Sequence, residues 1–182
     1  MSPVDVSVIV VTYKGWDRVR PCLESVFREC AGIAFEVIVV DNASGDGTPE
    51  NVRREFPLAR VVANETNRGF AAANNQGVRL SRGRYVLLLN PDTEVHDRAI
   101  GAVAGFLDAH PSAWVAGCRL NSSDGSLQPS VGAFPSVLEG VVKSSFLYLL
   151  LPRDALIGSR GIRRFDYTGP APVDWVMGAF FM

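Results

Sequence analysis

Three polar clusters follow three apolar runs of the sequence, and their residue types suit a charged ligand. Thr12-Tyr13 ends the first run, Asp41-Asn42 ends the second, and Asn90-Pro91-Asp92-Thr93-Glu94 ends the third. Pro91 cannot donate to a strand ladder, so we expect the third run to stop there. Carboxylate oxygens are preferred by Mg2+ and Mn2+, and phosphate often completes the coordination shell. We therefore predict that Asp92 binds Mg2+ or Mn2+, and that this metal binds the diphosphate of a nucleotide.

The elements that must position these clusters alternate between strands and helices. Two β-branched runs are typical of strands buried on both faces, at Val6–Thr12 and residues 35–40. Further strands are expected at residues 59–62, 85–89 and 114–120, and helices at residues 16–29, 48–56, 70–80 and 96–109. This alternation with short links predicts an α/β fold with a parallel sheet. The carboxyl ends of parallel strands share one edge, so the clusters should converge on one crevice.

The remainder of the chain has a different character. Residues 121–135 are rich in Ser, Gly and Pro, and Ser123-Asp124-Gly125-Ser126 predicts a hairpin turn. Residues 137–151 are apolar, but at this length, and with two charged residues, they are unlike a bilayer span. Two interpretations of them stay open, an acceptor-side amphipathic helix and a helix that lies on a membrane surface. Residues 174–182 are expected to begin another strand.

Composition limits the class of protein. The chain has 182 residues, of which 47% are hydrophobic, and its net charge is −1. This is enough for one globular domain, and the charge gives no field that attracts nucleic acid. The N-terminus lacks a basic segment followed by an apolar one, and the three cysteines lack zinc-like spacing. We expect a cytoplasmic protein, at the inner face of the cell membrane if residues 137–151 contact it.

Each candidate residue also has a structural interpretation that the sequence leaves open. Asp41 can accept a hydrogen bond from the ring N–H of a base, or cap the turn that follows it. Asp92 can bind the metal or cap the next helix. Arg68 can bind phosphate beside a helix N-terminus or remain a solvated loop charge. A calcium loop is excluded because Ala43 and Gly45 stand where it needs oxygen side chains.

The joint pattern resembles the family 2 glycosyltransferases, which are inverting enzymes with the GT-A (Rossmann-like) fold. Residues 8–13 resemble the opening strand of that family, and residues 39–48 resemble its nucleotide-binding turn. Residues 67–77 are similar to the stretch that closes over the nucleotide. Residues 88–92 stand where the family has its Asp-x-Asp metal motif. Residues 173–179 resemble the acceptor-side strand of its rhamnosyltransferase-like members.

The resemblance implies a mostly parallel, twisted sheet flanked by helices. Residues 1–120 would form the nucleotide-sugar-binding core, and residues 121–182 would begin the acceptor-side region of the same domain. The metal would be bound by Asp92. The nucleotide would be bound by Thr12, Tyr13, Asp41, Asn42, Arg68, Gly69, Asn75 and Asn90. The implied activity is metal-dependent transfer of rhamnose or a similar sugar, with inversion, from a nucleotide-diphosphate donor to a saccharide or lipid-linked acceptor in polysaccharide biosynthesis.

Two features depart from the family pattern. Asn90 replaces the first aspartate of Asp-x-Asp, so metal binding should depend on Asp92 and the phosphates. The family's catalytic base belongs to a Glu-Asp motif, and this chain contains no Glu-Asp pair. We therefore expect a C-terminally truncated chain whose base lies beyond Met182, and which binds nucleotide but turns over poorly. Asp174 is expected to be structural, and an unpaired edge strand leaves homo-oligomer formation open.

Two other functions remain as alternatives. A nucleotide-binding domain without catalysis also fits the missing base, although truncation of the chain explains the same fact more simply. A sugar nucleotidyltransferase fits less well, because such enzymes carry a glycine-rich basic loop after the first strand and this chain has Tyr13-Lys14-Gly15-Trp16. A phosphate-binding P-loop is excluded because its glycine-lysine pattern does not occur. A Glu-Asp pair encoded downstream would favour the enzyme.

Overall fold

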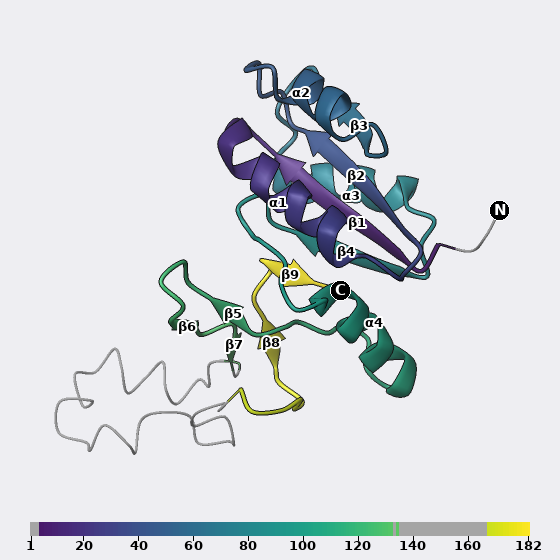
Figure 1. The fold of residues 1–182 in the computed structure, drawn as a ribbon, viewed down its shortest axis with the longest axis vertical. Coiled ribbons are helices and arrows are strands. Elements are labelled where there is room, and N and C mark those ends of the chain that lie inside the picture. The colour runs from purple at the N-terminus through teal and green to yellow at the C-terminus, as the bar shows by residue number, and fades with distance from the viewer. Residues whose placement is uncertain (1–3, 133, 135–166) are drawn as a thin grey trace, which may run out of the picture. The chain divides into compact units, whose positions relative to one another are not determined.

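The computed structural model describes residues 4–132, 134 and 167–182, which belong to two compact units (Figure 1). The first unit comprises residues 1–118 and 178–182, and the second comprises residues 119–177. The first unit contains, in chain order, β1 (Val6–Thr12), α1 (Trp16–Glu29), β2 (Phe35–Asp41), α2 (Thr48–Glu55), β3 (Arg60–Ala63), α3 (Phe70–Leu80), β4 (Tyr85–Leu89), α4 (Ala99–Ala109) and β9 (Phe180–Phe181).

One five-stranded sheet forms the centre of the first unit, in the order β3-β2-β1-β4-β9. The strands β1 to β4 pair in parallel, and β9 alone runs antiparallel, beside β4. All seven residues of β1 are buried, as its mostly β-branched sequence predicts for a central strand covered on both faces. The predicted mostly parallel α/β fold is confirmed.

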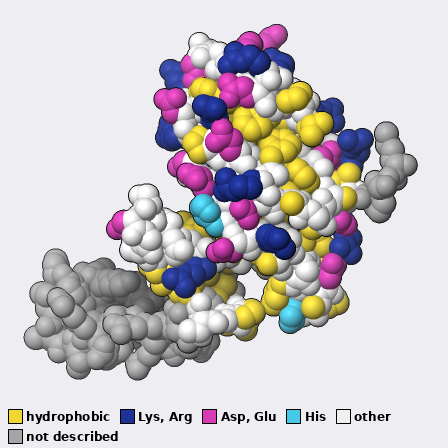
Figure 2. Space-filling model, viewed as in Figure 1, with side chains coloured by type: hydrophobic (Ala, Val, Ile, Leu, Met, Phe, Trp, Pro, Cys, Tyr) yellow, Lys and Arg dark blue, Asp and Glu magenta, His cyan; other side chains and the backbone are white. Residues whose placement is uncertain are grey.

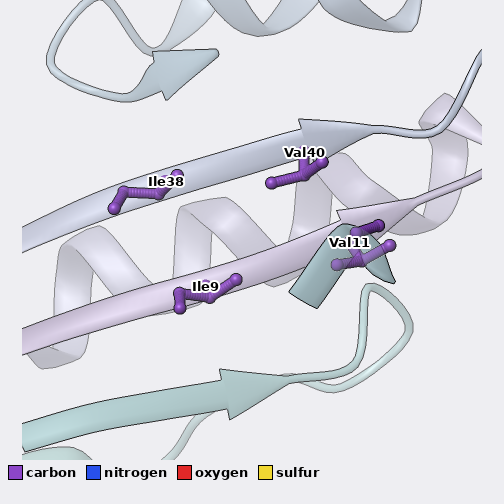
Figure 3. Packing of buried hydrophobic residues seen from close by; sticks show 5 residues of the cluster. Ile9, Val11, Ile38 and Val40 are labelled. Atoms are coloured by element: carbon purple, nitrogen blue, oxygen red, sulfur yellow. The ribbon is translucent and has the colours of Figure 1, made fainter. Parts of the chain in front are cut away.

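Helices cover both faces of this sheet. Figure 1 shows α1 on one face and α3 on the other. Beneath α3, the β1 residues Ile9 and Val11 lie beside the β2 residues Ile38 and Val40, and Ala73 of the helix completes the buried cluster (Figure 3). A Cβ added at Gly77 of α3 would lie 2.5 Å from Cγ2 of Ile9, so glycine permits this close approach of helix to sheet. These contacts fix the strands whose ends carry the polar clusters.

Three expectations about later elements are corrected. Residues 114–120 do not form the fifth strand of the sheet, which is β9. In that segment only Leu120 belongs to a strand, and the Trp114 side chain is 94% exposed. Residues 174–182 form two short strands rather than one, β8 (Trp175–Val176) and β9, which belong to different sheets. Helix α4 begins at Ala99 rather than His96 because the two preceding residues have left-handed φ angles of 54°.

The second unit contains two small antiparallel pairs. One joins β5 (Leu120–Asn121) to β6 (Leu127–Gln128), and the other joins β7 (Val131–Gly132) to β8. The predicted hairpin turn is confirmed between β5 and β6, where Gly125 N donates to Ser122 O over 2.9 Å. Asp174 Oδ2 accepts from Phe134 N over 3.0 Å, which fits its expected structural role.

The membrane interpretation of residues 137–151 lies outside the described residues. Among the helices that the structure describes, none is both long enough and apolar enough to cross a membrane. On the face drawn in Figure 2, basic and acidic side chains are interspersed, in keeping with the net charge of −1.

Candidate functional site

The carboxyl edge of the sheet brings the three polar clusters together. Thr12 and Asp41 end β1 and β2 directly opposite each other. On the other side of β1, Val10 pairs with Leu89, so Asn90 follows at the same edge. The strand order reverses at β1, because β2 and β3 lie on one side of β1 and β4 lies on the other side. Open α/β sheets bind ligands at such a reversal of strand order, so the candidate site lies between the ends of β1 and β4.

The edge contains two buried oxygen atoms that have no hydrogen-bond partner in the described part of the chain, Thr12 Oγ1 and Asp41 Oδ1. Both residues are almost fully buried, at 1% and 2% exposure. The second carboxylate oxygen of Asp41 accepts from Ser44 N over 3.0 Å, so the expected turn role is also present. Buried acceptors are nearly always paired, and these two are therefore suited to a donor that a ligand supplies. The Tyr13 side chain beside them is half exposed.

The loops after β1 and β2 are tied to each other. Ser44 Oγ accepts from Lys14 N over 2.8 Å, and Asp46 Oδ2 accepts from Gly15 N over 3.0 Å. Asp46 Oδ1 accepts from Thr48 N over 3.0 Å. The nearby Thr48 hydroxyl, and then the N–H groups of Thr48 and Gly15, lower the pKa of the Asp46 carboxyl group. This carboxylate therefore stays ionised and holds the two loops in one arrangement.

A network of side-chain amides connects β2 to the loop before α3. The Asn42 side chain is buried, donates to Asn67 Oδ1 over 2.8 Å and accepts from Arg68 N over 2.9 Å. Asn64 and Gln76 exchange two hydrogen bonds of 2.9 Å, and Asn64 Nδ2 also lies 3.2 Å from Asn42 Oδ1. Asn42 therefore fixes the position of the loop that contains Arg68. The sequence indicated Asn67 only as part of a loop that could add donors, and it did not identify Asn64 or Gln76, because amides are also ordinary turn and surface residues.

The predicted phosphate-binding residues surround the start of α3. Gly69 has a left-handed φ of 79° immediately before the helix, and Arg68 is exposed. The N–H groups of a helix N-terminus favour anions, so the position suits phosphate. Asn75 is exposed, whereas its neighbour Asn74 is buried and donates to Phe70 O over 3.0 Å. The structure therefore places Asn75 on the solvent side of α3 rather than in its packed face.

The predicted metal ligand lies on the loop after β4. Asn90 is half-buried, and Asp92 and Glu94 are exposed. Burial raises the pKa of the Cys22 thiol to about 12, and the negative charges of Asp92 and Glu94 add to this increase. Among the described residues, no group of three or more His, Cys, Asp or Glu side chains could hold a metal. The donor set thus fits a hard cation only if phosphate oxygens supply further ligands.

A shallow apolar groove of about 350 Å³ lies elsewhere in the first unit. Its lining includes Val86 and Leu88 of β4, Phe181 of β9 and the exposed Trp114. None of the predicted site residues lines it. The candidate site is therefore an open edge of the sheet rather than this groove.

Comparison with known proteins gives a family match and several relatives. The family model described as glycosyl transferase family 2 matches residues 7–161. The succinoglycan biosynthesis protein ExoO of Rhizobium meliloti is 36% identical over 92 residues, which are 50% of this chain and 26% of that protein. An N-acetylglucosaminyl-diphospho-decaprenol L-rhamnosyltransferase of Mycobacterium tuberculosis is 26% identical over 187 residues, 94% of this chain and 59% of that protein. The chain thus spans only part of these relatives.

Solved structures agree with this match. The mannosyltransferase PcManGT from Pyrobaculum calidifontis, in complex with GDP-Man and Mn2+, is 32% identical with a TM-score of 0.58. It matches 67% of this chain and 37% of its own chain. Staphylococcus aureus TarS 1–349, in complex with UDP-GlcNAc, is 23% identical with a TM-score of 0.60. It matches 80% of this chain and 48% of its own chain. The likeness to TarS concerns the fold alone.

Proposed function

The chain belongs to glycosyl transferase family 2, and from this premise we propose that residues 1–120 bind the nucleotide-diphosphate sugar donor of an inverting glycosyltransferase. Residues 121–182 then begin the side that meets a saccharide or lipid-linked acceptor. The proposal is carried by two buried oxygens of Thr12 and Asp41 at the strand edge, next to the Asp92 loop, that have no hydrogen-bond partner among the described residues.

The edge offers one group for each part of a nucleotide diphosphate. Asp41 Oδ1 is an acceptor for the ring N–H of the base, and Tyr13 offers an exposed aromatic face beside it. Arg68 and the N-terminus of α3 supply positive charge for phosphate. Asp92 provides the carboxylate for Mg2+ or Mn2+. The GDP-Man and Mn2+ bound in PcManGT support this class of donor.

The reaction that we propose is a single in-line displacement. An acceptor hydroxyl attacks the anomeric carbon from the face opposite the diphosphate, and a carboxylate base takes its proton as the bond forms. The residues of this chain hold the donor: Asp41 orients the base of the nucleotide, and Arg68 binds phosphate. A divalent cation at Asp92 would neutralise charge on the departing diphosphate. The relative from Mycobacterium tuberculosis supports rhamnose as the transferred sugar.

Calorimetric titration with dTDP, UDP and GDP, each with and without Mn2+, tests the donor site. We expect one nucleotide to bind, and Mn2+ to tighten its binding by about tenfold, which corresponds to about 1.4 kcal/mol. Asp92→Ala should abolish this gain. Glu94→Ala is the matched control, an exposed acid on the same loop that should keep it.

The outcomes separate the competing functions. Failure of all three nucleotides to bind to the folded protein would refute the proposal. Nucleotide binding that Mn2+ does not affect would leave the donor site and remove the metal role of Asp92. Binding without sugar transfer by a longer form that contains a Glu-Asp pair would favour the non-catalytic nucleotide-binding domain.

A further inference from the structure

We propose that helix α1 sets the position of the Asp92 loop for metal and nucleotide binding, and that Ser25 is the central positioning residue. The inference rests on the proposed function, because it assigns to Ser25 a role in the metal-dependent part of donor binding. It concerns a residue outside the edge cluster, on a helix that none of the sequence patterns connected with the ligand.

Two side chains of α1 hold the two ends of the loop that contains Asp92. Cys22 Sγ lies 3.6 Å from Asn90 O and donates to it. Ser25 Oγ accepts from Val95 N over 2.9 Å. Residues three apart lie on the same face of a helix, so one turn of α1 contacts both ends of this six-residue segment. Asp92 lies between the two attachment points.

The geometry of Ser25 makes its hydrogen bond specific. Its hydroxyl donates to Cys22 O over 2.7 Å, which uses its one hydrogen and leaves a lone pair for Val95 N. Ser25 is fully buried and Val95 is 3% exposed, so water does not replace this acceptor. A buried N–H without a partner is costly, and Ser25→Ala should therefore let the loop move.

A third contact continues the same face of α1. Glu29 Oε2 accepts from Arg98 N over 3.0 Å, where the loop enters α4. Asp97 and Arg98 both have left-handed φ angles of 54°, a conformation that non-glycine residues seldom adopt. The hydrogen bond from Arg98 N is also the main reason that the pKa of Glu29 is lowered. Glu29 thus holds the strained entry into α4, just beyond the Val95 end of the loop that Ser25 holds.

The chemistry of a metal site explains why such support matters. A carboxylate that binds a metal must be held close to its productive geometry by residues around it. Asp92 is exposed, and α1 restrains its loop at the two ends of the segment, while Thr93 N donates to Asn90 O over 3.2 Å within it. The α1 helix is a rigid base for them because Val19, Leu23 and Val26 are fully buried.

The test compares Mn2+-dependent nucleotide binding in matched serine variants. The nucleotide is whichever of dTDP, UDP or GDP binds the wild-type protein most tightly, titrated with and without Mn2+. Ser25→Ala removes the acceptor, and Ser25→Thr keeps a hydroxyl. Ser7→Ala is the control, because Ser7 is also fully buried and its Oγ accepts a backbone N–H, from Gly83 over 2.8 Å, at the opposite edge of the sheet. Glu29→Ala and Glu29→Gln form a second pair at a partly exposed side chain, which keeps the test valid if Ser25→Ala does not fold.

Mn2+ should tighten nucleotide binding by about tenfold in the wild-type protein, and we expect Ser25→Ala to lose this gain and to keep its metal-free affinity. Ser7→Ala should keep both the gain and the metal-free affinity. Ser25→Thr and Glu29→Gln should retain the gain, and Glu29→Ala should lose part of it. A full gain in folded Ser25→Ala and in Glu29→Ala would overturn the inference while leaving the donor site in place. A wild-type protein without any Mn2+-dependent gain would instead show that the metal part of the proposed function fails, and the inference with it.

Discussion

The Asp41→Asn variant separates binding from stability at the candidate site. Asp41 is 2% exposed, and its Oδ1 has no partner among the described residues, while its Oδ2 accepts from Ser44 N. Asparagine has the same shape and keeps one acceptor for Ser44, but it removes the negative charge. The turn after β2 should therefore survive the change, and a bound base should lose a charged acceptor.

The two expected effects have opposite signs. A hydrogen bond to a charged group contributes about 1.5–3 kcal/mol, so nucleotide affinity should fall by about 10-fold to about 100-fold. An unpaired buried carboxylate oxygen costs about 1–3 kcal/mol or more, so removing its charge should raise the free energy of unfolding of the free protein by about 1 kcal/mol. Calorimetric titration with the preferred nucleotide measures the first effect, and urea unfolding measures the second.

A matched substitution guards this prediction against general effects of charge. Asp108 is exposed on α4 and accepts from Arg84 and from Tyr85 Oη, each over 2.8 Å. Asp108→Asn removes the same charge away from the strand edge and should leave nucleotide affinity unchanged. If Asp41→Asn binds nucleotide as tightly as the wild-type protein, Asp41 is a turn residue only and the reasoning from its unpaired oxygen is wrong.

Two further predictions concern stability. Burial alone would raise the pKa of Glu36, but hydrogen bonds from Ser7 and Arg82 outweigh it and lower that pKa below its ordinary value of 4.5. The resulting stabilisation is present above about pH 4.5 and is lost as the pH falls through the lower folded-state pKa. In urea unfolding between about pH 3 and pH 7, Glu36→Gln should therefore lose less stability on acidification than the wild-type protein, and an equal loss in both proteins would contradict this. Gly77→Ala should lower the free energy of unfolding by about 1–3 kcal/mol, because its Cβ would lie 2.5 Å from Ile9. Gly105→Ala in α4 is the control: its Cβ would meet nothing within 4 Å, so it should raise the free energy of unfolding by about 0.5–1 kcal/mol. Shifts of the same sign in both variants would refute the packing argument.

The regular part of the fold could be predicted because its signals are local. The β-branched runs and helical stripes predict β1, α1, α3 and β4 with the bounds that the structure has. The GT-A fold and membership of the glycosyltransferase family were expected from motifs on these elements, and both are confirmed. Local patterns could not show which apolar segment would complete the sheet. Residues 114–120 are also largely apolar, but long-range packing decides that β9 pairs with β4.

The candidate site was predictable in its position and less so in its inner contacts. The clusters at Thr12, Asp41 and Asn90 meet at one edge because parallel strands place them there. The amide network around Asn42 depends on which side chains of separate loops approach each other, and spacing along the chain does not show this. Likewise, Asn74 is buried and Asn75 is exposed because of how α3 is rotated about its axis against the sheet. The nucleotide and metal roles themselves remain predictions.

The place of β9 in the chain has a consequence for the order of folding. β9 pairs with β4 across about ninety residues of sequence, and Ala179 O accepts from Asn90 N over 3.0 Å at the start of the Asp92 loop. Contacts of such high sequence separation form slowly, because the entropy of closing a long loop is lost before they contribute. During synthesis the four parallel strands emerge well before their antiparallel neighbour. We therefore expect the Asp41 side of the edge to acquire its structure first, and the Asp92 side to be completed only when the last strand docks.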